Sequence, residues 1–396
     1  MSKTIAINAG SSTLKFQLFE MPSENVIAKG LFERIGMDDA IVDISYGNDE
    51  KYHQVMPIND HEVAVNFLLK QLLSLAIIGD YNEITGVGHR VVAGGEYFKD
   101  SVLIDDDVIA KIDELSDYAP LHNPANLTGI KAFRKILPNV TSVAVFDTAF
   151  HQTMPEVNYM YSIPYEWYEK YGARKYGAHG TSHRYVANRA AEIIGKPLKD
   201  LKMITLHLGA GASITAIKDG QSFDTSMGFT PLAGVTMATR SGDIDASLVS
   251  WMQGKLNISD PEEMIDILNH KSGLVGVSGV SADMRDLEKV MDTNHRAKLA
   301  RDIWINRVIR YIGQYVAEMN GLDVLVFTAG VGENDIGIRQ SVADGLSYFG
   351  VGVDPDKNNI RGVERDLSSA AATVKTLLVP TDEELMIARD VERLKK

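Results

Sequence analysis

The fold is decided close to the start of the chain by the stretch Thr4-Ile-Ala-Ile-Asn-Ala-Gly-Ser-Ser-Thr-Leu-Lys15. An apolar run over residues 4–8 is followed by a turn of small residues, and residues 14–20 then alternate between apolar and polar. Such runs, separated by small residues, are typical of two strands joined by a tight turn. The stretch therefore predicts a strand, a small-residue turn and a second strand.

The same pattern returns half a chain later. The apolar run 201–208 ends in His207-Leu-Gly-Ala-Gly211, and residues 214–218 begin another strand before the hairpin signal Asp219-Gly220. Hydrophobic spacing elsewhere predicts strands at 26–34, 41–46, 84–92, 141–146 and 322–327, and helices at 61–78, 297–320 and 382–394. This alternation indicates an α/β fold, and the internal repeat suggests two similar α/β domains that face each other across a cleft.

Composition bounds the class of protein. The 396 residues include 40 Lys and Arg against 53 Asp and Glu, a formal net charge of −13, with 45% hydrophobic and 23% charged residues. These values indicate a globular chain of two or three domains and exclude a disordered chain or a coiled coil. The acidic balance argues against a nucleic-acid partner, which favours a basic surface. Because the sequence contains no cysteine, disulfides, thiolate nucleophiles, iron–sulfur clusters and cysteine zinc sites are excluded.

Export and membrane signals are also weak. Residues 1–8 carry no apolar core of signal-peptide length. The most apolar long stretch, residues 67–78, is interrupted by Lys70 and Gln71 and is too short to cross a bilayer. We therefore expect a cytoplasmic protein that does not associate with membranes.

Three glycine-containing turns follow expected strands. In residues 8–15, Gly10 allows close backbone approach, three hydroxyls follow it, and Lys15 adds a positive charge, which together suit a phosphate-binding hairpin. It is not a Walker-A loop, because a strand rather than a helix follows; the alternative is a polar turn with an exposed lysine. Residues 207–213 and 329–334 form the other two turns. Three such turns on buried strands fit the phosphates and sugar of a nucleotide.

Four charged or titratable residues lie at the ends of expected strands or in small-residue loops. Arg90 and Arg240 could each bind carboxylate or phosphoryl oxygens through a planar guanidinium, although a surface salt bridge is the alternative. His179 could be a buried structural histidine or a neighbour of a helix cap. Asp147 directly follows the strand 141–146, where it could act in catalysis, contact magnesium or cap a helix.

In combination these segments resemble the acetate kinase (acetokinase) family, within the acetate and sugar kinase/actin-like superfamily. The resemblance extends from Lys3 to about Arg389, and six motifs occur in the family's order. The motifs are Asn8–Lys15, Pro120-Leu-His-Asn-Pro-Ala-Asn126, Phe146-Asp-Thr-Ala-Phe-His151, His179-Gly-Thr-Ser-His183, Thr239-Arg-Ser-Gly-Asp243 and Thr328–Asn334.

The resemblance implies a fold, an assembly and a reaction. The fold is two duplicated actin-like (ribonuclease H-like) α/β domains facing across a nucleotide-binding cleft. Residues 1–150 with 384–396 would form the N-terminal domain, and residues 151–383 the C-terminal domain with the nucleotide-binding loops. The protein would be a homodimer that catalyses the magnesium-dependent reaction ATP + acetate ⇌ ADP + acetyl phosphate by direct in-line transfer.

The resemblance also implies roles for individual residues. Asn8 and Glu383 match positions linked to magnesium, for which manganese may substitute, and Arg90 matches the acetate-binding arginine. Asp147 matches the catalytic aspartate, while His179 and Arg240 match the groups that stabilise the transferring phosphoryl. Residues that match ATP contacts are Lys15, His207, Leu208, Gly209, Ala210, Gly211, Asp283, Met284, Arg285, Gly330, Val331, Gly332, Glu333 and Asn334.

Elementary chemistry agrees with these roles and refines one of them. Both substrates are anions, so catalysis is mainly positioning and charge neutralisation by Arg90, Arg240, Lys15, magnesium and His179 if it is protonated. Acetate is already ionised near neutral pH, and no proton must leave it before it attacks. We therefore expect Asp147 to orient an arginine or the waters of the metal rather than to act as a base.

Departures from the family pattern leave two properties undetermined, the preferred acyl chain of the substrate and the reaction rate. Alanine stands at 93, 178, 210 and 238, where the family usually has His, Phe, Asn and Gly. A propionate or other short-chain acyl kinase on the same scaffold is therefore an alternative. A nucleotide-gated binding or filament protein is a second alternative, since actin and heat-shock chaperones share this architecture. Arg90, Arg240 and His179 favour the kinase, because a filament protein has no use for a small-anion acceptor site.

Overall fold

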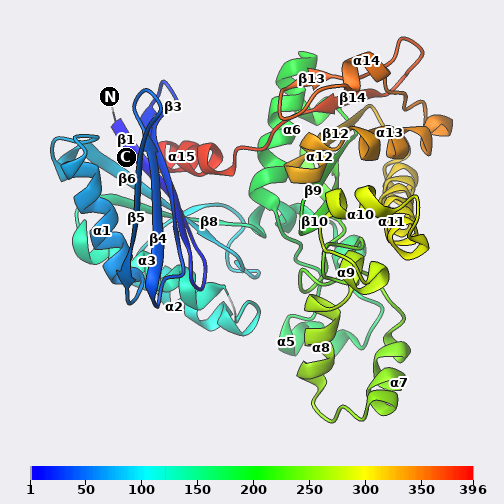
Figure 1. Ribbon diagram of the computed structural model, residues 1–396, viewed down its shortest axis with the longest axis horizontal. Helices are drawn as coiled ribbons and strands as arrows, with labels where there is room; N and C mark the ends of the chain where they lie inside the picture. Colours follow the sequence, from blue (N-terminus) through cyan, green and yellow to red (C-terminus); the bar gives the residue numbers. More distant parts are fainter. Residues whose placement is uncertain (1, 121, 396) are drawn as a thin grey trace. The chain divides into compact units, whose positions relative to one another are not determined.

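The computed structural model describes residues 2–120 and 122–395, and its internal contacts divide the chain into two compact units (Figure 1). Unit 1 contains the residues up to Phe150 and those from Asp382 onward, and unit 2 contains His151–Thr381. Leu121, within the motif at 120–126, lies outside the described residues. No described helix is both long enough and apolar enough to cross a membrane.

Unit 1 is built on an eight-stranded sheet in the order β5-β4-β3-β2-β1-β6-β8-β7. Strands β1 to β5 form an antiparallel meander, β1, β6 and β8 are parallel, and β7 pairs antiparallel with β8. The strands are β1 (Ser2–Ala9), β2 (Leu14–Met21), β3 (Asn25–Glu33), β4 (Met37–Tyr46), β5 (Glu50–Ile58), β6 (Ile84–Val91), β7 (Val102–Leu103) and β8 (Thr141–Phe146).

Helices cover both faces of this sheet, and successive residues of β6 face opposite helices. Gly86 and Gly88 face α15 (Glu383–Leu394), and a Cβ on either glycine would lie within 2.4 Å of Val391 or Ile387, so only glycine allows this close approach. On the opposite face the His89 ring packs edge-on against Phe133 of α3 (Asn123–Ile136) at 5.5 Å. Helices α1 (His61–Ser74) and α2 (Asp106–Glu114) pack against α3. The carboxyl-terminal helix thus completes the core of unit 1 (Figure 1).

Unit 2 repeats this sheet without the two outer strands. Its order is β11-β10-β9-β12-β14-β13, with β9, β10 and β11 antiparallel, β9, β12 and β14 parallel, and β13 antiparallel to β14. Strand for strand, these directions match β3-β2-β1-β6-β8-β7 of unit 1. The strands are β9 (Met203–Leu208), β10 (Ala212–Lys218), β11 (Gln221–Thr225), β12 (Val324–Thr328), β13 (Arg365–Asp366) and β14 (Lys375–Leu378). The α/β class and the internal duplication expected from the sequence are confirmed.

The helices of unit 2 also lie on two faces of their sheet. Thr205 and His207 of β9 face α6, while the alternate residues Ile204, Leu206 and Leu208 join the core beside α11. The helices are α4 (Glu156–Tyr159), α5 (Tyr165–Tyr171), α6 (Gly180–Ile194), α7 (Ala246–Leu256), α8 (Pro261–His270), α9 (Gly273–Ser278), α10 (Met284–Val290), α11 (His295–Met319), α12 (Ala329–Asn334), α13 (Ile336–Asp344) and α14 (Pro355–Asn358). Polar side chains thus gather on the α6 face of β9.

Two details differ from the sequence-based expectation. Residues 329–334 form the short helix α12 rather than a glycine turn, because the Glu333 carboxylate accepts a hydrogen bond from the Ala329 amide at 2.8 Å and caps the first turn. The strand β5 and the helices between residues 246 and 290 were not expected from hydrophobic spacing. Ala329 itself has φ 63°, a conformation that strains a non-glycine residue.

Candidate active site

In unit 1, Arg90 is held by two side chains at the carboxyl ends of neighbouring parallel strands. Its Nε and Nη2 donate to the two carboxylate oxygens of Asp147 at 3.2 and 2.5 Å, and its Nη1 donates to Asn8 Oδ1 at 3.2 Å. Asp147 is 1% exposed and Arg90 21% exposed. Burial raises the pKa of Asp147, and the Arg90 guanidinium opposes that rise. The carboxylate therefore fixes Arg90 in one orientation through a bidentate pair.

Two buried asparagines of α3 hold the backbone that follows Arg90. Asn123 accepts from the Ala93 amide at 3.0 Å and donates to the Ala93 carbonyl at 3.1 Å. Asn126 accepts from the Val92 amide at 3.2 Å and donates to the Ala9 carbonyl at 2.7 Å, which ties β6 to β1. Both asparagines belong to the motif at residues 120–126, and no individual role was predicted for either of them. Their function is to position the strand ends from which Asn8 and Arg90 project.

The amino terminus of α15 adds three acidic residues to unit 1. Asp382 caps the helix by accepting from the Leu385 amide at 2.9 Å. Burial, followed by repulsion from Asp147, raises the pKa of Glu383 to about 7, although Arg90 opposes it. Glu384 forms an ion pair with Lys15 at 2.5 Å. Asn8, Lys15, Arg90, Asp147 and Glu383 are therefore all residues of unit 1, and Lys15 is paired with an acid rather than free.

The turn between β1 and β2 is fixed by short-range contacts. The Gly10 amide donates to the Thr13 carbonyl at 2.9 Å, and His61 Nε2 donates to the Gly10 carbonyl at 2.7 Å. A Cβ on Gly10 would lie 2.6 Å from the Thr13 hydroxyl oxygen, so a larger residue here would force the threonine side chain to move. The hairpin predicted from residues 8–15 is confirmed as a structure, and its phosphate-binding role stays a prediction.

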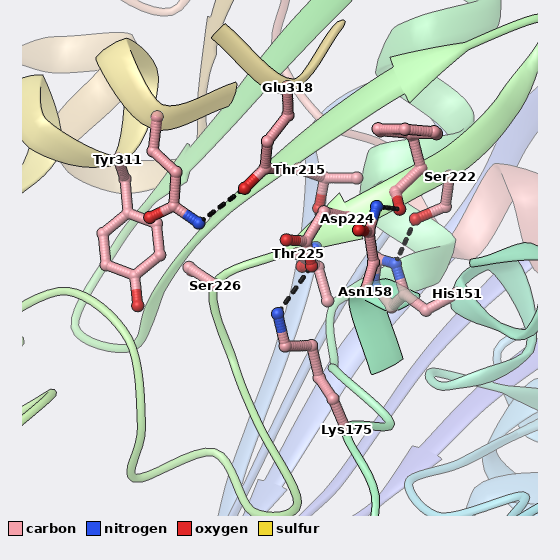
Figure 2. A network of polar contacts seen from close by, with 12 residues as sticks. His151, Asn158, Lys175, Thr215, Ser222, Asp224, Thr225, Ser226, Tyr311 and Glu318 are labelled. Carbon is pink, nitrogen blue, oxygen red and sulfur yellow. Dashed lines mark hydrogen bonds and ion pairs between the residues drawn. The ribbon is translucent and has the colours of Figure 1, made fainter. Parts of the chain in front are cut away.

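In unit 2, His179 immediately precedes α6 and has a left-handed backbone, with φ 58° and ψ 21°. Such a conformation costs a non-glycine residue strain energy and is concentrated at functional sites. His151 Nε2 donates to the carbonyl of Ala178 at 3.0 Å, and Figure 2 shows His151 beside Ser222, whose hydroxyl lies 2.8 Å from Nδ1. The His179 ring stacks on His207 with centroids 4.1 Å apart. The backbone and the ring of His179 are therefore both fixed.

Arg240 lies beside His179 and lacks a compensating acid. A Cβ placed on Gly211 would be 3.4 Å from Arg240 Nη1 and 3.7 Å from His179 Nε2, so both groups converge over this glycine. Arg240 Nη1 donates to the Pro231 carbonyl at 3.4 Å, and no ion pair joins Arg240 to any described acid. Burial lowers the pKa of Arg240. A half-buried, unpaired guanidinium is stabilised by an anion that binds from solution.

A cavity of about 970 Å³ in unit 2 begins at the same glycine turn. Its wall includes the buried, apolar Trp304 and Met284, and the charged Glu288 and Arg361. Asp283 caps α10, and Arg285 lowers the pKa of Asp283 to about 2. Of the residues expected to contact a nucleotide, those that line the cavity are Gly209, Ala210, Asp283, Met284, Arg285, Gly330, Val331 and Asn334.

The other expected nucleotide contacts of unit 2 do not line this cavity. His207 stacks on His179 and bonds to Ser182 at 2.8 Å, and the Leu208 side chain is buried in the core. Glu333 turns inward, where its carboxylate accepts from the amides of Ala329 and Thr381. Gly211 and Gly332 also lie outside the lining. Glu333 therefore has a structural contact that the sequence did not predict.

Comparison with known proteins places this geometry in a family. A model described as the acetokinase family matches residues 3–389. The chain belongs to the acetokinase family. Acetate kinase from Limosilactobacillus fermentum is 65% identical, over all of both chains. Among solved structures, that of Porphyromonas gingivalis acetate kinase has 44% sequence identity to the chain and a TM-score of 0.96. That of a propionate kinase from Francisella tularensis has 40% sequence identity and a TM-score of 0.93, and both comparisons cover all of both chains.

As a member of the acetokinase family, the protein is a phosphotransferase with a carboxyl group as acceptor, and its solved relatives share the two-unit α/β fold. Four alanines stand where the resemblance led us to expect His, Phe, Asn and Gly. Ala210 and Ala238 line the cavity, where the Ala238 amide donates to the Ala210 carbonyl at 3.1 Å. Ala178 and Ala93 are buried, one beside His179 and the other held by Asn123. The departures therefore touch the cavity and the positioning of the site, while the charged groups remain.

The acetokinase family implies magnesium, and the donor set of unit 1 fits it. Asn8 offers an amide oxygen and Glu383 a carboxylate, and the electrostatic coupling of Glu383 to Arg90 and Asp147 places it near them. Among the described residues no group of three or more His, Asp or Glu side chains could hold a metal. Magnesium does not require such a cage, since it is commonly held by one or two carboxylates with waters and substrate phosphates.

Proposed function

We propose that this protein is an acetate kinase, which transfers a phosphoryl group reversibly between ATP and acetate to give ADP and acetyl phosphate. The observation that carries the proposal is the unpaired Arg240 guanidinium, which converges with His179 over Gly211, the residue that follows Gly209 and Ala210 of the cavity lining. An uncompensated cation beside a histidine and a glycine turn suits a transferring phosphoryl group, whose charge is spread over three equatorial oxygens. The volume of the cavity, and its lining of both apolar and charged side chains, suit a nucleoside.

In this proposal Arg240 and His179 stabilise charge on the transferring group, and unit 1 supplies the acceptor. Arg90 binds the carboxylate of acetate, and Asp147 holds the guanidinium in place through both carboxylate oxygens. Because acetate is already ionised, no base is needed to activate it. We therefore assign Asp147 as an orienting residue, consistent with its bidentate contact to Arg90.

Magnesium would be held by Asn8 and Glu383, with water and phosphate oxygens as the remaining ligands. When bound, it would neutralise charge on the phosphates and orient them for in-line attack. Manganese, which has similar oxygen-ligand preferences, may replace it. The nucleotide would bind in the cavity, with its phosphates at the turn 209–211 and α12, and its base between the apolar wall at Met284 and the segment near Asn334.

The test is acyl phosphate formation that depends on ATP and magnesium, trapped with hydroxylamine as the hydroxamate, with acetate, propionate and butyrate assayed in parallel. We expect acetate to give the highest kcat/KM. A lead by propionate or butyrate would correct the substrate and indicate that Ala93 or Ala178 enlarges the acyl site. No product with any acid, although ATP binds, would contradict the kinase.

We also propose that the enzyme is a homodimer and acts in the cytoplasm, as the resemblance and the sequence imply. Large apolar side chains are exposed on α5 and α7 of unit 2, including Trp167 and Trp251. Exposed aromatic patches of this kind mark protein interfaces. Light scattering coupled to size exclusion should give twice the chain mass of 43.5 kDa, and a monomer at micromolar concentration would refute the dimer.

A further inference from the structure

Three hydrogen bonds connect His179 to a threonine in the middle of the unit 2 sheet. The Ser213 hydroxyl of β10 lies 2.8 Å from His179 Nδ1 and 2.7 Å from His183 Nε2, so two histidines share one hydroxyl. On its other side, His183 Nδ1 lies 2.7 Å from the Thr205 hydroxyl of β9. The contacts therefore form one chain: Thr205, His183, Ser213 and His179.

His183 has one ring proton to share between its two neighbours. It is fully buried, and burial followed by the adjacent His151 and His207 holds the pKa of His183 well below its usual value. A neutral imidazole donates from one nitrogen and accepts at the other. Because Ser213 also has a single hydrogen, the direction of every bond in the chain is set once the direction of one bond is known.

Two directions satisfy the three bonds. In the first, Thr205 donates to His183 Nδ1, His183 Nε2 donates to Ser213, and Ser213 donates to His179 Nδ1. A neutral His179 then carries its proton on Nε2. In the second, every bond is reversed: His179 Nδ1 donates to Ser213, and Thr205 accepts from His183. His179 is then either a cation or a neutral ring with a bare Nε2.

The surroundings of Thr205 select the first direction. Its hydroxyl is completely buried, and His183 is its only hydrogen-bond partner among the described residues. In the reversed chain the Thr205 hydrogen would have no acceptor, and a buried donor without an acceptor is costly. In the first direction every hydrogen in the chain has an acceptor. The stacked His207 and the Arg240 cation, which face His179 from β9 and from the loop 237–243, also disfavour a charged His179.

We infer that Thr205 is a positioning residue which, acting through His183 and Ser213, keeps the ring proton of a neutral His179 on Nε2. This nitrogen is the one that converges with Arg240 over Gly211. The catalytic consequence of this inference rests on the proposed function. If a phosphoryl group is transferred here, the Nε2–H of His179 would donate to its oxygens, whereas the opposite tautomer would present a lone pair to them. Without the hydrogen-bond chain from Thr205, the tautomer with a lone pair on Nε2 would be favoured, because the positive charge of the neighbouring Arg240 attracts a lone pair.

The test replaces Thr205 with isosteric valine and with serine, which retains the hydroxyl. The matched control is Thr215→Val, because Thr215 lies directly opposite Thr205 on β10, is equally buried, and bonds to Thr225 instead of the histidine chain (Figure 2). Histidine-selective ¹⁵N NMR, assigned with His179→Gln, reports which ring nitrogen carries the proton. Steady-state kinetics report the consequence.

In the wild type, the Thr205→Ser variant and the Thr215→Val variant, we expect His179 protonated on Nε2 and neutral at pH 7.5. Thr205→Val should move the proton toward Nδ1 and lower kcat by roughly 10-fold, the low end for residues that orient a functional histidine, with KM for ATP and acetate little changed. If Thr205→Val fails to fold, Ser213→Ala must lose the same tautomer preference.

Three results would overturn the inference: a wild-type His179 that is charged or protonated on Nδ1, an unchanged tautomer in Thr205→Val, or the same kinetic loss in Thr215→Val. The NMR result does not depend on turnover. A wild-type protein that makes no acyl phosphate yet shows the expected tautomer would therefore refute the proposed function and leave the hydrogen-bond chain standing.

Discussion

Replacing Asp147 with asparagine should separate an orienting role from a role as base. The substitution keeps the shape of the side chain but replaces one carboxylate oxygen with an amide that cannot accept from Arg90. The structure shows two contacts, at 3.2 Å and 2.5 Å, to a carboxylate that is 1% exposed. Each charge-assisted hydrogen bond of this kind contributes about 1.5–3 kcal/mol. Losing one of them should lower kcat/KM for acetate by about 10- to 100-fold.

Stability should fall together with activity, because Arg90 would lose its counter-charge. Breaking a buried ion pair from one side costs about 3–5 kcal/mol. For a unit of this size that corresponds to a fall of about 6–20 °C in the melting temperature. Both quantities can be measured on the same preparation, by calorimetry and by the hydroxamate assay with acetate varied.

Asp224→Asn is the matched control in the other unit. Asp224 is buried and pairs with Lys175 at 2.6 Å in the polar network of Figure 2, so its removal also breaks a buried pair. It should lower stability and leave kcat/KM for acetate within about twofold, because residues with no shared partner act independently, and Asp224 shares none with Asp147 among the contacts of the described residues. Full activity and stability in Asp147→Asn would refute the orienting role. A loss of activity that disappears at high pH would instead support a base.

Further changes test the other groups of the site. Arg240→Gln should lower kcat by about 100- to 1000-fold, as expected for loss of a charge-stabilising donor, without lowering the melting temperature, because the guanidinium has no acid partner. Gly211→Ala should lower kcat about 10-fold, because its methyl would fill the space over which Arg240 and His179 converge, at 3.4 and 3.7 Å from them. Gly254→Ala, where a Cβ meets nothing within 4 Å, should have no effect in the hydroxamate assay. Burial lowers the pKa of His89 to about 3, so the free energy of unfolding should fall as the pH is lowered from 6.5 toward 3. About 2 kcal/mol should be lost by pH 5, and His89→Leu should remove this loss in urea unfolding.

Much of the fold could be predicted because its strands are of two recognisable kinds. Some are short, continuous apolar runs, and others alternate between apolar and polar residues. The duplicated hairpin at residues 4–20 and 201–218 was visible since each copy places apolar residues on both sides of a small-residue turn. The helices between residues 246 and 290 were missed because they are short and their apolar spacing is irregular. Their aspartate caps, such as Asp245 and Asp260, were the available signal.

The site was predictable where a charged residue follows a strand and unpredictable where contacts cross the sequence. Arg90 lies near the carboxyl end of β6 and Asp147 follows β8, the parallel neighbour of β6, so their pairing follows from the sheet order. No periodicity connects Thr205 to His183, because one lies in a strand and the other on the helix that packs over it. The contact of the Glu333 carboxylate with the Ala329 amide in the first turn of α12 also had no signal in the sequence, and the nucleotide contact expected of Glu333 stays a prediction.

Arg90 of unit 1 and Arg240 of unit 2 differ in the state of their charge, and the difference agrees with the tasks proposed for them. Arg90 is paired with Asp147, so in the proposed role its neutralised guanidinium would orient acetate without binding the carboxylate strongly. Arg240 is unpaired, and its full charge is available to oxygens that become more negative during transfer. A site with both arginines paired would position its substrates and stabilise little. A site with both unpaired would bind the anionic ground states strongly and gain no rate. Under the proposed roles, the stronger positive field of the unpaired Arg240 would act on the group whose charge changes during transfer.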